Sequence, residues 1–176
     1  MRKFFNLIII TVILVSCSTS THECPVQTNG SINGVNQTVK MGSQASVDVF
    51  HELDSAWNSG DYDLIKTFIS ADAKMSFCDG FTVVGPDDFI NKIQKDAELR
   101  NEQELKFERT TDYVFSLAVT ESKDNNFGVG DWVNAQITKT YTDTDSEQRI
   151  EVYRELFYII DGQIVDWSQF KRIVLK

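Results

Sequence analysis

The sequence predicts an α+β domain in which three N-terminal helices precede a sheet of long strands. Residues 47–97 hold apolar stripes at helical spacing, separated by Gly-Asp, Asp-Gly and Gly-Pro breaks. From residue 105 onward the pattern changes to strand-like segments, and Asp161-Gly162 is a two-residue turn signal between the last two. One folded domain is therefore expected over residues 47–176.

Helix boundaries can be assigned from the turn and cap residues. Gly60 is expected to end the first helix in the left-handed conformation, and Asp61 to cap a short second helix. Gly85-Pro86 opens the third helix, with two aspartates at the positive end of its dipole. The first helix has one apolar face, formed by Val49, Phe50, Leu53, Ala56 and Trp57.

The strands follow from apolar runs bounded by turns. Asp79-Gly80 predicts a tight two-residue hairpin between residues 73–78 and 81–84. Longer strands are expected over 105–119, 132–141, 149–160 and 163–174. If Asp161-Gly162 is a regular two-residue turn, it pairs Tyr158 with Val165, Leu156 with Trp167, and Arg154 with Gln169.

The N-terminus has the pattern of a secretory signal. Two basic residues precede an apolar segment over residues 4–15, which is short for a membrane span. Leu14-Val15-Ser16-Cys17 resembles a bacterial lipobox, which implies a signal peptide over 1–16 and lipidation of Cys17, including palmitate. Ser18, in place of Asp, favours the outer membrane of the cell envelope. An ordinary cleaved signal or a signal anchor is the alternative.

Residues 17–46 are rich in Ser, Thr, Asn, Gly and Gln, so they are expected to form a flexible tether. Cys24 on this tether and Cys78 in the domain are the only possible disulfide pair of the mature chain. Free thiols are the expectation, and a disulfide is the alternative.

Charge and composition argue against several functions. The formal net charge is −9 and the pI is about 4.7, which disfavours nucleic acid as a partner because phosphate binding needs clustered basic residues. Two separated histidines and no tight acidic cluster give no reason to expect a metal site. No phosphate-binding glycine loop is present, and no cofactor is expected.

Three motifs resemble the nuclear transport factor 2-like superfamily, including its SnoaL-like branch: AWNSGD at 56–61, CDG at 78–80 with Gly85 following, and YIIDGQIV at 158–165. The resemblance covers roughly residues 45–173. It implies a cone-shaped, curved antiparallel sheet packed on the three helices, with a ligand site at the mouth of the cone. This fold hosts isomerases, cyclases, dehydratases, epoxide hydrolases and many non-enzymes, so it does not give the function.

The resemblance also suggests which side chains line the cone. Where limonene-epoxide-hydrolase-like members carry Trp-x-Asp, this chain has Trp167-Ser168-Gln169, and an Arg-x-Asp corresponds to Asn134-x-Gln136. Amides bind polar groups but do not exchange protons near neutral pH. The expected ligand pocket therefore holds Trp132, Asn134, Gln136, Arg154, Trp167 and Gln169.

Three functions follow from these expectations. The first is a lipid-anchored envelope domain whose cone binds a small molecule or a partner without catalysis. The second is a SnoaL-like isomerase, cyclase or hydrolase that transfers protons on a small hydrophobic substrate. It requires a one-residue register shift that turns Tyr153, Glu155 and Asp166 inward. The third is a protein-interaction module or a homodimer formed through the sheet. Whether Gln169 or Asp166 points into the cone separates the first two.

Overall fold

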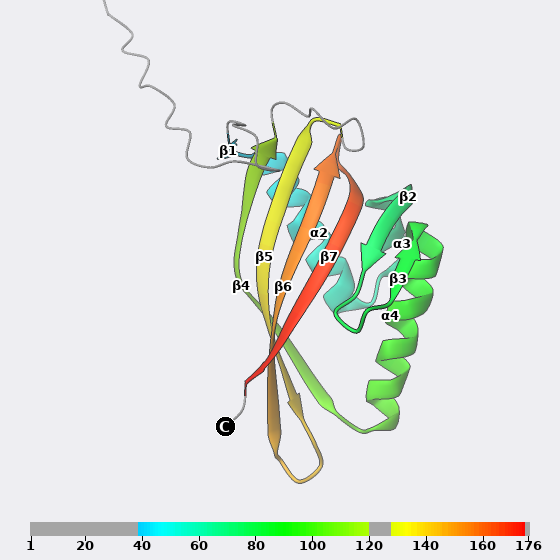
Figure 1. Ribbon diagram of the computed structural model, residues 1–176. Coiled ribbons are helices and arrows are strands. Elements are labelled where there is room, and N and C mark those ends of the chain that lie inside the picture. Colours follow the sequence, from blue (N-terminus) through cyan, green and yellow to red (C-terminus); the bar gives the residue numbers. More distant parts are fainter. Residues whose placement is uncertain (1–38, 120–127, 175–176) are drawn as a thin grey trace, which may run out of the picture.

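The domain is one strongly curved, unclosed mixed sheet that packs on three helices (Figure 1). The computed structural model describes residues 39–119 and 128–174. The predicted signal peptide, Cys17, Cys24 and the tether up to residue 38 lie outside the described residues. Within the described ranges, no helix is both long and apolar enough to cross a membrane.

The three helices begin and end close to their predicted positions. They are α2 (Gln44–Ser59), α3 (Tyr62–Thr67) and α4 (Gly85–Glu102). Gly60 ends α2 with a φ of 72°, and the side chain of Asp61 accepts a hydrogen bond of 3.0 Å from the Leu64 N–H, so both predicted caps are confirmed. Helix α2 begins at Gln44, inside the segment expected to be tether, because Ser43 supplies its N-cap.

Within residues 39–119 and 128–174, seven strands form the sheet in the order β1-β4-β5-β6-β7-β2-β3. Strand β2 lies parallel to β7, so the sheet is mixed, whereas an antiparallel sheet was expected. The parallel pair arises because the chain returns through α4 and a four-strand meander before β7 reaches β2. The strands are β1 (Val39–Met41), β2 (Ile69–Ser76), β3 (Thr82–Val84), β4 (Lys106–Val119), β5 (Gly130–Thr142), β6 (Gln148–Ile160) and β7 (Gln163–Val174).

The turn between β2 and β3 differs from the predicted two-residue hairpin. Ser76 pairs with Thr82, which leaves residues 77–81 in the loop. Gly80 has a φ of 87°, and the Asp79 carboxylate accepts a hydrogen bond of 3.0 Å from the Phe81 N–H. This side-chain bond stabilises a wider turn, because Asp can replace a backbone acceptor two residues away.

The closing hairpin has the predicted turn but not the predicted register. Asp161 and Gly162 have φ values of 49° and 78°, and Ile159 pairs with Ile164. A β-bulge then inserts Val165, so Tyr158 pairs with Asp166. The expected pairs Tyr158–Val165, Leu156–Trp167 and Arg154–Gln169 are therefore wrong. The observed pairs are Phe157–Trp167, Glu155–Gln169, Leu156–Ser168 and Arg154–Phe170.

An aromatic cluster joins the helices to the sheet face that they cover, which is called the concave face below. Trp167 is 0% exposed and lies at the centre of this cluster. Its ring centroid is 4.9 Å from that of Phe77 and 5.4 Å from that of Phe89, while Phe50 of α2 packs on Phe157. Strands β4 to β6 continue beyond this cluster towards the β5–β6 turn (Figure 1), and the site described next lies in that part of the cone.

Candidate functional site

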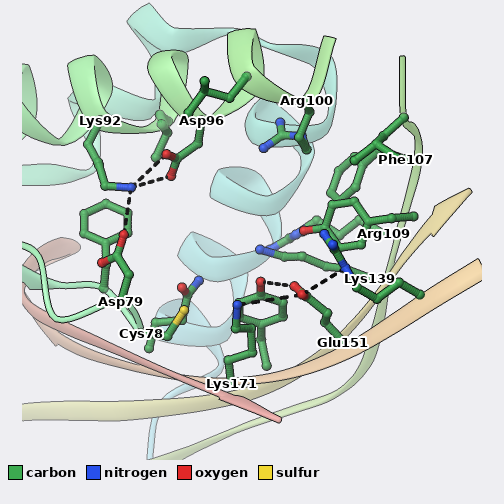
Figure 2. A pocket seen from close by; sticks show the side chains of 18 of the residues that line it. Cys78, Asp79, Lys92, Asp96, Arg100, Phe107, Arg109, Lys139, Glu151 and Lys171 are labelled. Carbon is green, nitrogen blue, oxygen red and sulfur yellow. Dashed lines mark hydrogen bonds and ion pairs between the residues drawn. The ribbon is translucent and has the colours of Figure 1, made fainter. Parts of the chain in front are cut away.

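A cavity of about 250 Å³ lies between α4 and the concave face of the sheet, and is called the cone cavity below. Figure 2 shows that basic and acidic side chains converge in it from the helix and from several strands. The lining residues that carry charge are Asp79, Lys92, Asp96, Arg100, Arg109, Lys139, Arg149, Glu151 and Lys171. Aromatic rings form much of the remaining wall: Trp57, Phe77, Phe107, Tyr141 and Tyr153.

Cross-strand pairing arranges the inward side chains in rows. The strand registers give, from the mouth to the floor, the rows Phe107–Tyr141–Arg149, Arg109–Lys139–Glu151, Thr111–Ile137–Tyr153–Lys171, Ala135–Glu155–Gln169 and Val133–Phe157–Trp167. The cone therefore changes from charged and aromatic at its mouth to apolar at its floor.

Arg109 contacts other residues of the protein, which largely balance its charge. It forms an ion pair with Asp54 of α2, and its guanidinium lies 5.7 Å from the ring of Trp57. Thr111 donates a second hydrogen bond of 3.0 Å to the same carboxylate. This cluster fixes α2 to β4, and the Arg109 charge is largely balanced by Asp54.

Glu151 is the acceptor of a buried polar cluster. The Tyr153 hydroxyl donates to it over 2.5 Å, and Arg149 and Lys171 form ion pairs with it at 3.3 and 3.7 Å. Burial raises the pKa of Tyr153, and the hydrogen bond to Glu151 raises it further. Tyr153 therefore stays a phenol and acts as a hydrogen-bond donor.

Glu155 is the most deeply buried acid of the concave face, at 1% exposure. Gln169 donates a hydrogen bond of 2.9 Å to its Oε1. Its Oε2 and the indole Nε1 of Trp167 are buried polar atoms without a hydrogen-bond partner among the described residues. Buried polar atoms are usually paired, so these two unpartnered atoms are exceptional among the buried groups beneath the cavity.

Lys139 extends from β5 over the ring of Tyr153, with its Nζ 3.9 Å from the ring centroid. In the described parts of the chain no carboxylate lies within ion-pair distance of its ammonium group. Burial lowers the pKa of Lys139 to about 8, Glu155 opposes this shift, and the positive charges of Arg109 and Arg100 add to it.

Two arginines and two aromatic rings form the mouth of the cone cavity. The guanidinium of Arg100 lies 4.8 Å from the ring of Phe107, Phe107 lies 5.4 Å from Tyr141, and Arg149 lies 4.7 Å from Tyr141. At the other side of the cavity, Lys92 of α4 binds two acids and holds the helix to the β2–β3 turn (Figure 2).

The bulge at Val165 determines which residues of β7 face the cone. The sequence had assigned Trp167 and Gln169 to the predicted ligand pocket, and Tyr153, Glu155 and Asp166 to the alternative catalytic site. Gln169 lines the cone cavity, and Trp167 lies beneath it in the floor. Tyr153 and Glu155, which were expected inward only after a register shift, lie on the same concave face. Asp166 lies on the opposite, convex face and is half-buried. Gln169, not Asp166, therefore points into the cone.

The other predicted pocket residues lie on the convex face, outside the cone cavity. The ring centroid of Trp132 lies 4.7 Å from that of Tyr158, and Gln136 donates a hydrogen bond of 3.0 Å to Asp112. Their placement is corrected because inward positions on β5 and β6 are odd-numbered: Val133, Ala135, Glu151 and Tyr153 are buried. Asn134 and Arg154 line a separate convex groove of about 500 Å³ with Tyr113, Phe115, Ala135, Leu156 and Phe170.

The sequence reasoning missed Arg100, Arg109, Lys139, Glu151 and Lys171. A signal for two of them was present, because Lys139 is in phase with the apolar residues Val133 to Ile137 at alternate positions, and Glu151 is in phase with Tyr153. A charge in the buried phase of a strand indicates a functional or paired group.

Metal and thiol chemistry have little support in the described residues. Residues 39–119 and 128–174 contain no group of three or more His, Cys, Asp or Glu side chains that could hold a metal ion. Among the described residues Cys78 has no disulfide partner; burial raises the pKa of its thiol, while Lys171 opposes the shift. The predicted alternative of a Cys24–Cys78 disulfide cannot be placed, since Cys24 lies outside the described residues.

No protein-family model matches the sequence, and a search of curated proteins finds no match. Solved structures do match. A proposed polyketide cyclase from Xanthomonas campestris pv. campestris has 16% sequence identity and a TM-score of 0.51, over 72% of this chain and 90% of its own. A proposed ketosteroid isomerase from Kribbella flavida has 10% identity and a TM-score of 0.52, over 76% of this chain and 82% of its own.

A third similar structure is an NTF2-like protein of unknown function from Burkholderia pseudomallei. It has 12% identity and a TM-score of 0.54, and the match covers 74% of this chain and 92% of that one. At this level of identity the similarity establishes the fold and leaves substrate and activity open. The sheet order, the three helices and these matches show that the chain has the nuclear transport factor 2-like cone fold.

Proposed function

We propose that the cone cavity binds a small organic anion, in a domain that a lipid anchor holds at the bacterial cell envelope. The observation that carries the proposal is a reversal of charge. The chain has a net charge of −9, yet six basic side chains and only three acidic ones line the cone cavity. A low-dielectric cleft with one sign of charge concentrates ligands of the opposite sign.

Two of the six cations are available to a ligand. The other four form ion pairs within the protein. Arg109 pairs with Asp54, and Lys92 pairs with Asp79 and Asp96. Arg149 and Lys171 both pair with Glu151. By contrast, Arg100 and Lys139 have no ion-pair partner among the described residues. Arg100 stacks on Phe107 at the mouth, which leaves the edge of its guanidinium for a carboxylate or phosphate.

The dimensions of the cavity favour a compact ligand. Its volume of about 250 Å³ lies below the range of roughly 300–1,000 Å³ typical of drug-sized ligands. The aromatic walls and the unpaired cations suit a ligand with an apolar body and an anionic group.

The test compares an arginine of the cone cavity with one of the convex groove. Isothermal titration calorimetry with small carboxylates, such as benzoate, glycolate and phenylacetate, measures binding to the full-length chain. Arg100→Gln is expected to weaken binding about 10-fold or more, because it removes a charge-assisted hydrogen bond. Arg154→Gln is the matched control and is expected to leave the affinity unchanged. Weaker binding in Arg154→Gln with unchanged affinity in Arg100→Gln would place the ligand site on the convex face and contradict the proposal.

The lipid anchor is supported by the sequence alone, through the signal-like segment over residues 4–15 and the lipobox-like residues before Cys17. The expected result is palmitate labelling and globomycin-sensitive processing of the wild-type chain, and loss of both in Cys17→Ala. Labelling that persists in Cys17→Ala would exclude this anchor. Fractionation of the envelope then tests the outer-membrane location.

A second candidate function is proton transfer on a small hydrophobic substrate. It is favoured by the inward Tyr153–Glu151 pair at 2.5 Å and by Glu155 below it, which supply a donor and a base in one cleft. Proton abstraction is measured by NMR as deuterium exchange at the carbon next to the carbonyl of an added ketone. Glu155→Gln and Glu151→Gln should lower the exchange rate at least about 100-fold if the chain catalyses it. Exchange no faster than in buffer excludes this candidate.

A further inference from the structure

Lys139 lines the cone cavity and forms no ion pair with the described residues. It projects from the concave face of β5, and its cross-strand neighbours are Arg109 on β4 and Glu151 on β6. Its Nζ lies over the face of Tyr153 and therefore does not donate a hydrogen bond to the Tyr153 oxygen. The amine lines the cone cavity, where a ligand can reach it.

The carboxylates around Lys139 are occupied by other groups. Asp54 pairs with Arg109, Glu151 accepts from Tyr153 and pairs with Arg149 and Lys171, and Glu155 accepts from Gln169. Within residues 39–119 and 128–174, Lys139 itself has no ion pair. Lys92, the lysine of α4 that lines the same cavity, is instead held at 2.7 and 3.2 Å by two aspartates.

We propose that Lys139 is a nucleophilic amine that forms an imine with the aldehyde or ketone carbonyl of a small oxo acid. The proposal rests on the function proposed above, because the anionic end of the oxo acid would bind Arg100 at the mouth while its carbonyl reaches Lys139. A half-buried amine without an ion-pair partner loses its proton more readily and then has a free lone pair, whereas a salt-bridged ammonium stays protonated.

The chemistry needs no further reactant. The neutral Lys139 nitrogen attacks the carbonyl carbon, a C–N bond forms, and the electron pair of the C=O bond moves to oxygen. Two hydrogens leave the nitrogen with that oxygen as one water molecule, which leaves a C=N bond. The pKa of about 8 supports this role, because it gives Lys139 a far larger neutral fraction at neutral pH than an exposed lysine has.

Reductive trapping tests the proposal directly. The full-length chain in detergent is incubated with glyoxylate and sodium cyanoborohydride, which reduces an imine to a stable carboxymethyl-lysine. Peptide mapping by mass spectrometry then gives the rate at each lysine. Lys139 is expected to react at least about 10-fold faster than exposed Lys95 in the same sample, with a pH dependence centred near 8. Equal rates at Lys139 and Lys95 in the wild-type chain would overturn the proposal.

Two variants and a competitor complete the experiment. Lys139→Arg keeps the charge and should abolish the fast adduct, while Lys95→Arg is the matched control and should retain it. Glycolate has the anionic group of glyoxylate without the carbonyl, so it should slow trapping at Lys139 by competition. A fast adduct that survives in Lys139→Arg would contradict the assignment.

Calorimetry with glycolate separates the two proposals. Binding of glycolate without selective trapping at Lys139 would uphold the anion site and exclude the imine. Selective trapping at Lys139 without measurable glycolate binding would uphold the amine and exclude the proposed anion site. Absence of both would exclude both.

Discussion

Glu155 and Gln169 are cross-strand partners on the concave face of the sheet, joined by a hydrogen bond of 2.9 Å. One inserted residue makes this pair possible. Without the bulge at Val165, the regular hairpin would pair Gln169 with Arg154 and place Trp167 opposite Leu156. The composition of the cone therefore depends on the bulge as much as on the side chains that line it.

Deletion of Val165 tests this dependence. The deletion joins Ile164 directly to Asp166 and removes the bulge, so Phe157–Trp167 and Glu155–Gln169 can pair as before and both β7 side chains stay on the concave face. Only the local twist of the bulge and the half-buried Val165 side chain are lost, so the deletion is expected to cost no more than about 2 kcal/mol and to leave Trp167 buried. Urea denaturation followed by tryptophan fluorescence measures the loss.

The control is deletion of Thr144, an exposed residue of the β5–β6 turn. It is expected to cost less than about 1 kcal/mol. A Val165 deletion that costs several kcal/mol more than the Thr144 deletion would contradict the assignment of Val165 as the unpaired residue of the bulge.

Lys139 should give a distinctive dependence of stability on pH. Its pKa is about 8 in the folded chain against an ordinary value of 10.5, so the cost of burying its charge is present below pH 8. As the pH rises from about 8 to 10.5 the folded chain releases the proton first, and the free energy of unfolding rises. Lys139→Met removes the charge and is expected to be more stable than the wild type at pH 7 by roughly 1–3 kcal/mol.

The measurement is urea denaturation of both proteins from pH 7 to pH 10. The advantage of Lys139→Met should shrink across this range, while exposed Lys95→Met should track the wild type. An advantage that stays constant with pH would mean that Lys139 is not desolvated.

Asp131 should contribute to stability in acid. Burial alone would raise its pKa, but hydrogen bonds from the Ser43 and Ser46 side chains and from the Ser43 N–H outweigh burial and lower it. A carboxyl with a lowered pKa stabilises the fold above its unfolded value, and this stability is lost as the pH falls through the folded pKa. Asp131→Asn is expected to cost about 1–2 kcal/mol at pH 7 and progressively less in acid.

Thermal unfolding of the wild type and Asp131→Asn between roughly pH 6 and pH 3 checks this expectation. Exposed Asp145→Asn serves as the control, with no change of more than about 0.5 kcal/mol. If Asp131→Asn and Asp145→Asn are equally stable at pH 7, Asp131 does not support the start of α2.

Gly85 should tolerate substitution least among the glycines with positive φ. Its φ is 78°, and an added Cβ would lie 2.6 Å from the carbonyl oxygen of Ala71. Gly80 also has a positive φ, but a Cβ there would meet no atom within 4 Å. Gly80→Ala is expected to cost about 1–2 kcal/mol for backbone strain, and Gly85→Ala at least about 1 kcal/mol more because backbone must move. Urea denaturation gives both values, and equal costs would contradict the clash.

Much of the fold could be predicted from local sequence signals. Gly60, Asp61, Gly85 and the Asp161-Gly162 turn each act within a few residues, so their caps and turns were read correctly. The parallel β2–β7 pair could not be read in this way. It depends on where distant segments meet, which no local pattern specifies.

The candidate site was harder to predict for a physical reason. A bulge adds one residue, and one residue reverses the face of every later side chain. Trp167 and Gln169 were placed inward although the pairing used to place them was wrong, while Arg154 was placed on the wrong face. Lys139 and Glu151 needed no register argument, because each is in phase with the buried residues of its own strand, but a charged residue in a strand was taken for a surface residue.

The position of β1 has a consequence for how the cone would meet its ligand. Strand β1 pairs with residues 117–119 of β4, whereas the mouth of the cone cavity is built from Phe107 at the other end of that strand. About ten residues of strand separate them, or roughly 33 Å, and Figure 1 shows β1 at the end of the sheet far from the β5–β6 turn. A chain anchored through Cys17 would therefore be attached at the end of the sheet away from the mouth, so the attachment point would not cover the entrance through which a ligand reaches the cone cavity.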